Sequence, residues 1–219
     1  MPRDTVLAAV RTALLDVAPS PAATPAPTVG AEPCTDRHTL ATRFVAQARA
    51  VGTVVHTVGS QAAAAAVLAT LLDDAHAERV IAWPTPLARA LALTAAARGI
   101  DVRLVDPGTT VATVADADVG ITEADALVAA SGTLVLCAGT GARAVSLLPR
   151  THVAIVPAVR LVADLATALR HVRARAGAPD TCVTLVTGPS RTADIEKKLV
   201  VGVHGPCVLH VILLDDTEG

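Results

Sequence analysis

Aromatic side chains are almost missing from this sequence of 219 residues, which has no Tyr, one Phe (Phe44) and one Trp (Trp83). Proteins that bind single-stranded nucleic acid stack the bases on aromatic rings and attract the backbone with basic residues. With a formal net charge of −2, the chain lacks both the rings and the positive field that such binding requires. We therefore expect no nucleic-acid partner.

Long apolar runs are also missing. No uninterrupted run reaches the roughly 18 residues that a membrane span requires. Charged residues occur at helical spacing through the first 16 positions, unlike the apolar centre of a signal peptide. Hydrophobic residues nevertheless make up 52% of the chain and charged residues 17%, which is enough for a large buried core. We expect a cytoplasmic protein without a membrane span.

Closely spaced cysteines are a third absence. Cys34, Cys137, Cys182 and Cys207 lie far apart, whereas iron–sulfur and structural zinc sites normally include at least one close pair. No His and carboxylate residues have metal-ligand spacing, and there is no flavin or nicotinamide-binding fingerprint. We therefore expect this chain to bind no metal ion, cluster or redox cofactor.

The N-terminal region is expected to be a helix on a tether. Residues 3–16 place five apolar side chains on one helical face: Val6, Leu7, Val10, Leu14 and Leu15. Residues 17–33 are rich in Pro and Ala, which predicts an extended linker. We divide the chain into residues 1–35, a helix plus linker, and residues 36–219, a folded domain. The apolar helix face predicts self-association or docking to a partner.

From residue 36 onward the chain predicts alternating helices and strands. The expected helices cover residues 36–50, 60–72, 86–97 and 161–173, and the expected strands cover residues 53–58, 79–84, 101–106, 152–157, 181–187 and 208–215. Such alternation favours an α/β fold with a mostly parallel sheet flanked by helices. Between residues 120 and 136 the pattern instead predicts a β-hairpin inserted in the sheet, and Thr122 and Asp125 have the spacing of a single capped helical turn.

The segment from Thr187 to Pro206 has the pattern of a binding site. Gly188, Pro189 and Ser190 predict a tight turn after a strand, with Ser190 capping a short helix that begins near Arg191. The N-terminus of a helix suits an anion, and Arg191 adds a cation with bidentate geometry. Thr192 and Asp194 are further polar candidates, and a second turn is predicted from Gly202, His204, Gly205 and Pro206. The alternative is that Gly-Pro-Ser simply starts a helix.

In open α/β sheets, ligands bind beyond the carboxyl ends of the parallel strands. The loops expected there are Gly59–Ser60, Thr85 and Gly188–Thr192.

Other candidate residues carry a weaker signal. Thr133 closes a glycine-containing turn, and Arg143 ends a GTGAR stretch that is more typical of a plain turn than of a phosphate-binding loop. His204 is the best candidate for a general acid or base by residue type, but bonding to a backbone carbonyl would explain it equally well. Three further histidines lie inside strand patterns and are expected to be structural: His56, His152 and His210. No residue is assigned as catalytic.

Several stretches of the C-terminal half resemble the LUD-domain family, specifically the lactate utilisation protein C group. They are TGPSRTADIE, GVHGP, GITEADALVAASGTLVL, SLLPRTHVAIVP and LHVILLDD. The resemblance implies a NagB/RpiA/CoA-transferase-like sheet, here with an inserted β-hairpin and an N-terminal helical extension. It also implies a subunit of a bacterial L-lactate oxidation system that converts L-lactate to pyruvate together with iron–sulfur partner proteins. The clusters would reside in those partners.

The resemblance also bears on individual residues. An Arg usually precedes the SLLP motif of the family, which supports Arg143, whereas Ala130 stands where the family usually has an acidic residue. Transferases of the superfamily use a Glu nucleophile, so Ala130 counts against transferase chemistry. We expect a non-redox subunit whose Gly188–Thr192 turn and His204 bind a small carboxylate. The alternatives are a stand-alone enzyme or binding protein for a phosphorylated or CoA-linked ligand, and a small-carboxylate sensor.

Overall fold

The chain divides into two units, Met1–Glu32 and Pro33–Gly219. The computed structural model describes residues 4–5, 7–9, 12, 36–106, 108–137, 143–175, 183–192, 200–202 and 204–215. In the first unit the described residues are helical and exposed. Of the five apolar residues expected on the face of the N-terminal helix only Leu7 is described, and it is 42% exposed. The linker predicted over residues 17–33 lies outside the described residues.

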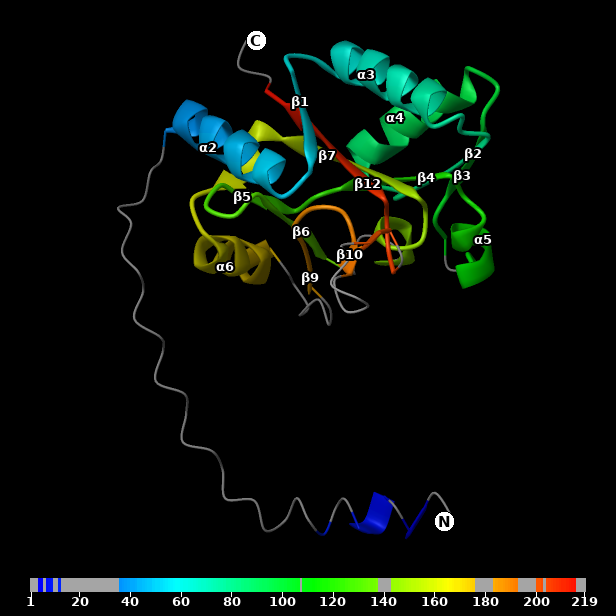
Figure 1. Cartoon of the computed structure of the whole chain (residues 1–219), viewed down its shortest axis with the longest axis vertical. Coiled ribbons are helices and arrows are strands. Elements are labelled where there is room, and N and C mark those ends of the chain that lie inside the picture. The colour runs from blue at the N-terminus through cyan, green and yellow to red at the C-terminus, as the bar shows by residue number, and fades with distance from the viewer. Residues whose placement is uncertain are drawn as a thin grey trace. The chain divides into compact units, whose positions relative to one another are not determined.

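The second unit is built on a main sheet of six strands in the order β1-β12-β7-β4-β2-β3 (Figure 1). All neighbouring strands of this sheet pair in parallel, which confirms the mostly parallel sheet. The strands are β1 Val54–Val58, β2 Arg79–Ala82, β3 Asp101–Leu104, β4 Val119–Glu123, β7 Thr151–Pro157 and β12 Val208–Leu214. The central strands β7 and β12 are covered on both faces, and this is why their sequences are nearly continuous apolar runs.

The helices begin where the sequence places good N-caps. The Asp36 side chain accepts a hydrogen bond from the Thr39 backbone and starts α2 (Arg37–Ala50), and Ser60 caps α3 (Gln61–Asp74) in the same way. The other helices are α4 (Pro86–Ala96), α5 (Val111–Ala115) and α6 (Leu165–Arg175). Helices α3 and α4 lie side by side on one face of the main sheet (Figure 1).

A second sheet of four strands, in the order β8-β5-β6-β9, stacks on the other face. Its strands are β5 Ala126–Val128, β6 Thr133–Cys137, β8 Leu161–Val162 and β9 Val183–Val186. Leu127, Leu134 and Leu136 pack into the main core, whereas Val128 and Val135 pack with α6. The strand pattern therefore alternates between two buried surfaces, which places this sheet between the main sheet and α6.

This second sheet corrects two predictions. The hairpin expected within residues 120–136 exists as the antiparallel pair β5–β6, but it belongs to the second sheet and is not inserted in the main one. Thr122 and Asp125 do not cap a helical turn, because Thr122 lies in β4 and Asp125 donates its N–H to Val135 across the hairpin. Helix α6 begins later than predicted because Leu161–Val162 pair as β8 with β5.

The short helix predicted to begin near Arg191 does not begin there. Arg191–Thr192 form strand β10, which pairs in antiparallel fashion with β11, Val200–Val201. The reason lies in the Ser190 backbone, whose N–H donates to Pro206 and whose carbonyl accepts from Gly202. These long-range hydrogen bonds replace the bonds to the next turn that a helix would require.

Candidate functional site

Two turns that are separated in the sequence meet in the structure. The Ser190 N–H donates to the Pro206 carbonyl at 3.0 Å, and the Gly202 N–H donates to the Ser190 carbonyl at 2.9 Å. A Cβ added to Gly205 would stand only 3.0 Å from the Cβ of Ser190. The turn at Gly188–Ser190 and the turn at His204–Pro206 are therefore in direct contact. This neighbourhood is what His204 needs if it is to act with Ser190 on one ligand.

Together with β9 and the first residues of β7 and β12, the two turns enclose a pocket of about 210 Å³. We call this space the turn pocket. Four of the predicted site residues line it, namely Gly188, Ser190, His204 and Gly205. His204 is exposed at its mouth, whereas His152 and Leu209 are fully buried at its inner end.

The turn pocket is at the opposite edge of the main sheet from the one predicted. His152 and Leu209 are the second residues of β7 and β12, so the pocket lies at the amino ends of these strands. The prediction failed because β9, which leads into Gly188, pairs antiparallel with β6 in the second sheet. At the carboxyl edge, Ser60 and Thr85 directly precede α3 and α4.

Arg191 does not line the turn pocket. Its guanidinium Nη2 donates a hydrogen bond to the carbonyl oxygen of Val51, just after α2. Gly188 has a φ of +80°, and an added Cβ would collide with that same Val51 carbonyl. Both residues therefore anchor the first turn to the end of α2. Thr192 pairs with Val200 of β11, and Asp194 lies outside the described residues.

Thr133 contacts the residue that precedes the first turn. Its hydroxyl lies 2.7 Å from the Ser131 hydroxyl and 2.8 Å from the hydroxyl of Thr187, which directly precedes Gly188. Arg143 starts the short 3₁₀ helix η2, Arg143–Ser146, and its carbonyl accepts a hydrogen bond from the Ser146 hydroxyl at 2.9 Å. Because Ser146 lines the turn pocket, Arg143 belongs to the wall behind the pocket.

His152 is the residue of the turn pocket that sequence reasoning missed. Its side chain is completely buried, and its Nε2 lies 2.8 Å from the hydroxyl of Thr122. Its Nδ1 has no hydrogen-bond partner in the part of the chain that the structure describes. Burial lowers the pKa of His152 to about 4, so the ring is neutral at pH 7. The only signal in the sequence was a polar residue at the start of an apolar strand.

The other two strand histidines satisfy each other. His56 Nε2 and His210 Nδ1 are 3.3 Å apart on the adjacent strands β1 and β12. Burial lowers the pKa of both rings, to about 4 for His210, and the positive charge of the neighbouring His56 adds to the shift of His210. The structural role expected for them agrees with this pairing.

A buried ion pair at the carboxyl edge was also missed. The Glu123 carboxylate is 6% exposed and lies 2.7 Å from Nη2 of Arg160, which is 23% exposed. Its second oxygen accepts the N–H of Leu87 in the first turn of α4 at 3.1 Å, and Arg160 Nη1 donates to the Ala124 carbonyl at 2.7 Å. Both carboxylate oxygens are engaged, so Glu123 joins three segments and is not a free nucleophile.

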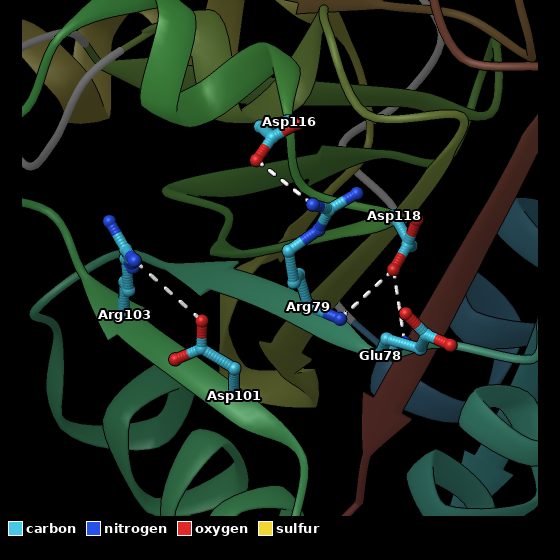
Figure 2. Close-up of polar contacts among 6 residues, drawn as sticks. All are labelled: Glu78, Arg79, Asp101, Arg103, Asp116 and Asp118. Atoms are coloured by element: carbon cyan, nitrogen blue, oxygen red, sulfur yellow. Dashed lines mark hydrogen bonds and ion pairs between the residues drawn. The ribbon is translucent and has the colours of Figure 1, made fainter.

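A second hollow, of about 340 Å³, lies beside β2 and β3, where polar side chains pair with one another (Figure 2). It is less suited to a ligand. Arg79 already pairs with Asp116 at 3.0 Å, and Arg103 with Asp101 at 3.7 Å. Asp118 accepts two backbone N–H groups at the start of β2. Because these side chains are exposed and mutually neutralised, the hollow offers an anion or cation little unused charge.

The described residues contain no group of three or more His, Cys, Asp or Glu side chains placed to hold a metal ion. Cys137 is buried and Cys207 is partly exposed, while Cys34 and Cys182 lie outside the described residues. In the described part of the chain no helix is long and apolar enough to cross a bilayer.

Similarity to known proteins identifies the family of this chain. Residues 41–214 match the family model of the LUD domain. The chain belongs to the LUD domain family. All nine candidate residues fall within this LUD domain, whereas the N-terminal helix and linker precede it.

Individual relatives agree with this assignment. A protein of Shouchella clausii named lactate utilization protein C is 48% identical over 103 residues, which cover 46% of this chain and 45% of that protein. The Bacillus subtilis protein of the same name is 44% identical over 104 residues, covering 46% and 43%. That of Halalkalibacterium halodurans is 38% identical over 153 residues, covering 67% and 66%. The matched stretch thus spans less than half of the first two relatives.

The LUD fold is confirmed by a solved structure as well. The crystal structure of a DUF162 family protein from Deinococcus radiodurans superposes with a TM-score of 0.64 at 26% sequence identity. The superposition covers 82% of this chain and 98% of that one. The α/β architecture and the family resemblance of the C-terminal half are therefore both confirmed.

Proposed function

We propose that this LUD domain chain is a subunit of a lactate utilisation system that works with iron–sulfur partner proteins to convert L-lactate to pyruvate. The observation that carries the proposal is the LUD match over residues 41–214, together with relatives named lactate utilization protein C. The name belongs to those relatives, and its transfer to this chain is our inference.

Within such a system we assign electron transfer to the partners. Oxidation of lactate to pyruvate removes two electrons, which a redox cofactor must accept. The four cysteines of this chain include no close pair, and the described residues offer no gathered set of metal ligands. The iron–sulfur clusters are therefore best placed in the partner subunits, and this chain supplies binding and docking.

The turn pocket is the candidate place for a small carboxylate in this proposal. It brings together the backbone of the Gly188 turn, the Ser190 hydroxyl and the exposed His204. The N-terminal helix predicted over residues 3–16 is the candidate docking element, because its apolar face precedes the LUD domain.

A gene deletion tests this function. The deletion strain should fail to grow on L-lactate as sole carbon source but should grow normally on pyruvate, the product, and the full chain should restore growth. A tagged chain should co-purify with iron-containing partners whose eluate reduces an artificial acceptor when L-lactate is added. Wild-type growth of the deletion strain on lactate would contradict the proposal. A lone, iron-free chain that binds an acyl-CoA or a sugar phosphate would favour the stand-alone alternative.

A further inference from the structure

One residue that lines the turn pocket has a polar atom without a partner. The side chain of His152 is fully buried, and among the described residues its Nδ1 has no hydrogen-bond partner. Buried polar groups in folded proteins are almost always hydrogen-bonded, so an orphan of this kind needs an explanation. Among the described residues the other buried side-chain atoms without a partner belong to Thr53, Thr85 and Asp215, none of which lines this pocket.

The neighbour of His152 determines which ring nitrogen carries the proton. Among the described residues the completely buried hydroxyl of Thr122 makes no side-chain hydrogen bond other than the one to Nε2, at 2.8 Å. If Nε2 donated, the hydroxyl hydrogen would be buried without an acceptor, which is costly. We therefore assign the Thr122 hydroxyl as the donor and Nε2 as the acceptor. In the neutral ring the proton then sits on Nδ1, which is a donor without an acceptor.

The charges around His152 favour a negative ligand. Strands β9 and β12 contribute no charged side chain to the lining, and the described lining residues include no carboxylate. Basic residues occur in or next to the lining segments: His204 lines the pocket, Arg143 and Arg150 stand at the two ends of the segment that leads into β7, and Arg191 follows the first turn. An acceptor that brings negative charge meets no repelling group among these residues.

We propose that the turn pocket binds a small monocarboxylate and that His152 Nδ1–H donates a hydrogen bond to its carboxylate. The size of the pocket, about 210 Å³, and its apolar lining residues Leu147, Pro206 and Leu209 suit a short-chain acid. We assign a carboxylate because His152 Nδ1–H needs an acceptor and the described lining residues supply none. The choice of L-lactate and pyruvate as probes rests on the proposed function.

Side-chain NMR of the full-length chain with labelled histidine tests this directly. Titration with sodium pyruvate or sodium L-lactate should shift the ring signals of His152 in a saturable way, whereas the neutral amide lactamide should bind at least about tenfold more weakly. A bound carboxylate also raises the pKa of the ring, so affinity should rise about tenfold as the pH falls from 7 to 5.

Two matched variants separate a binding role from a structural one. In His152→Gln the amide reaches the Nε2 position and keeps a partner for Thr122 but leaves nothing at Nδ1, so pyruvate binding should weaken at least about tenfold. In His152→Asn the amide stands near Nδ1 and should retain more of the affinity. His56→Gln, a change in the other histidine pair, should leave pyruvate binding unaltered.

Three results would overturn the inference: no saturable shift of His152 with either acid, equal affinity for lactate and lactamide, or unchanged pyruvate binding by His152→Gln. If that variant does not fold, the pH series on the unaltered chain decides. The proposed function is tested separately from the binding site. A chain that binds pyruvate although its deletion leaves growth on lactate intact refutes the function and keeps the site.

Discussion

Glu123 links three parts of the LUD domain at the carboxyl edge of the main sheet, and its removal makes a sharp test of how that edge is stabilised. Its two oxygens contact Nη2 of Arg160 at 2.7 Å and the N–H of Leu87 at 3.1 Å. Both β4 and β7 leave the main sheet here and continue into the second sheet as β5 and β8. Replacing Glu123 with Ala therefore disturbs two crossover connections and the start of α4.

The expected loss of unfolding free energy follows from the two groups that Glu123→Ala leaves without their partner. With the carboxylate gone, the Arg160 guanidinium, 23% exposed, keeps its bond to the Ala124 carbonyl but loses its counter-charge. The N–H of Leu87 also loses its acceptor. Breaking a buried pair by removing one partner typically costs about 3–5 kcal/mol. For a chain of this length that loss lowers the midpoint of thermal unfolding by roughly 10 °C.

Urea unfolding followed by circular dichroism at pH 7 measures the free energy directly. The matched variants are Arg160→Met alone and the double variant Glu123→Ala/Arg160→Met. The double variant should be less destabilised than the sum of the two single changes, because the second change removes the charge that the first left unpaired. A loss below about 1 kcal/mol for Glu123→Ala, or strict additivity in the double variant, would refute the reasoning.

The remaining predictions concern protonation, the first turn and helix capping. Burial lowers the pKa of His152 from 6.5 to about 4, so the unfolded chain binds a proton more readily than the folded one. The free energy of unfolding should therefore be highest above pH 6.5 and should fall by up to about 3 kcal/mol toward pH 4. Urea midpoints measured between pH 7 and pH 4.5 would show this loss. Gly188→Ala should unfold at a lower temperature than Gly99→Ala. The two glycines have similar φ values, +80° and +85°, but of these two positions only 188 places an added Cβ against a backbone carbonyl. Equal losses of thermal stability would contradict this packing. Ser60→Ala removes a hydrogen bond to the backbone of α3 and should cost about 1 kcal/mol in urea unfolding, whereas Thr85→Ala, at a cap without such a bond, should cost distinctly less.

The elements of the main sheet were largely predictable because their signals are local. Apolar alternation and N-caps such as Ser60 reside in a few consecutive residues, and the structure has helices and strands at these places within a few residues. The second sheet was not predictable in the same way. Its pairing sets Leu134 beside Val186, and no pattern in either segment names a partner so distant in the chain.

The candidate site shows the same division. The sequence identified the two turns at Gly188 and His204 from their turn-forming residues, and the structure brings them into contact. It predicted that Arg191 supplies a cation to a bound anion, but the guanidinium bonds to the Val51 carbonyl, 140 residues away. It placed His152 among the structural histidines, because a strand pattern does not show that one ring nitrogen would have a partner and the other would not.

By itself the sequence determined the fold class, the family and the positions of the turns, because periodicity, capping and motif are properties of neighbouring residues. Only the tertiary structure decided at which edge of the sheet the turn pocket lies, that Glu123 pairs with Arg160, and that His152 Nδ1 has no hydrogen-bond partner among the described residues. Each of these facts depends on which groups meet across the fold, and burial then sets whether a polar atom is satisfied, charged or available to a ligand.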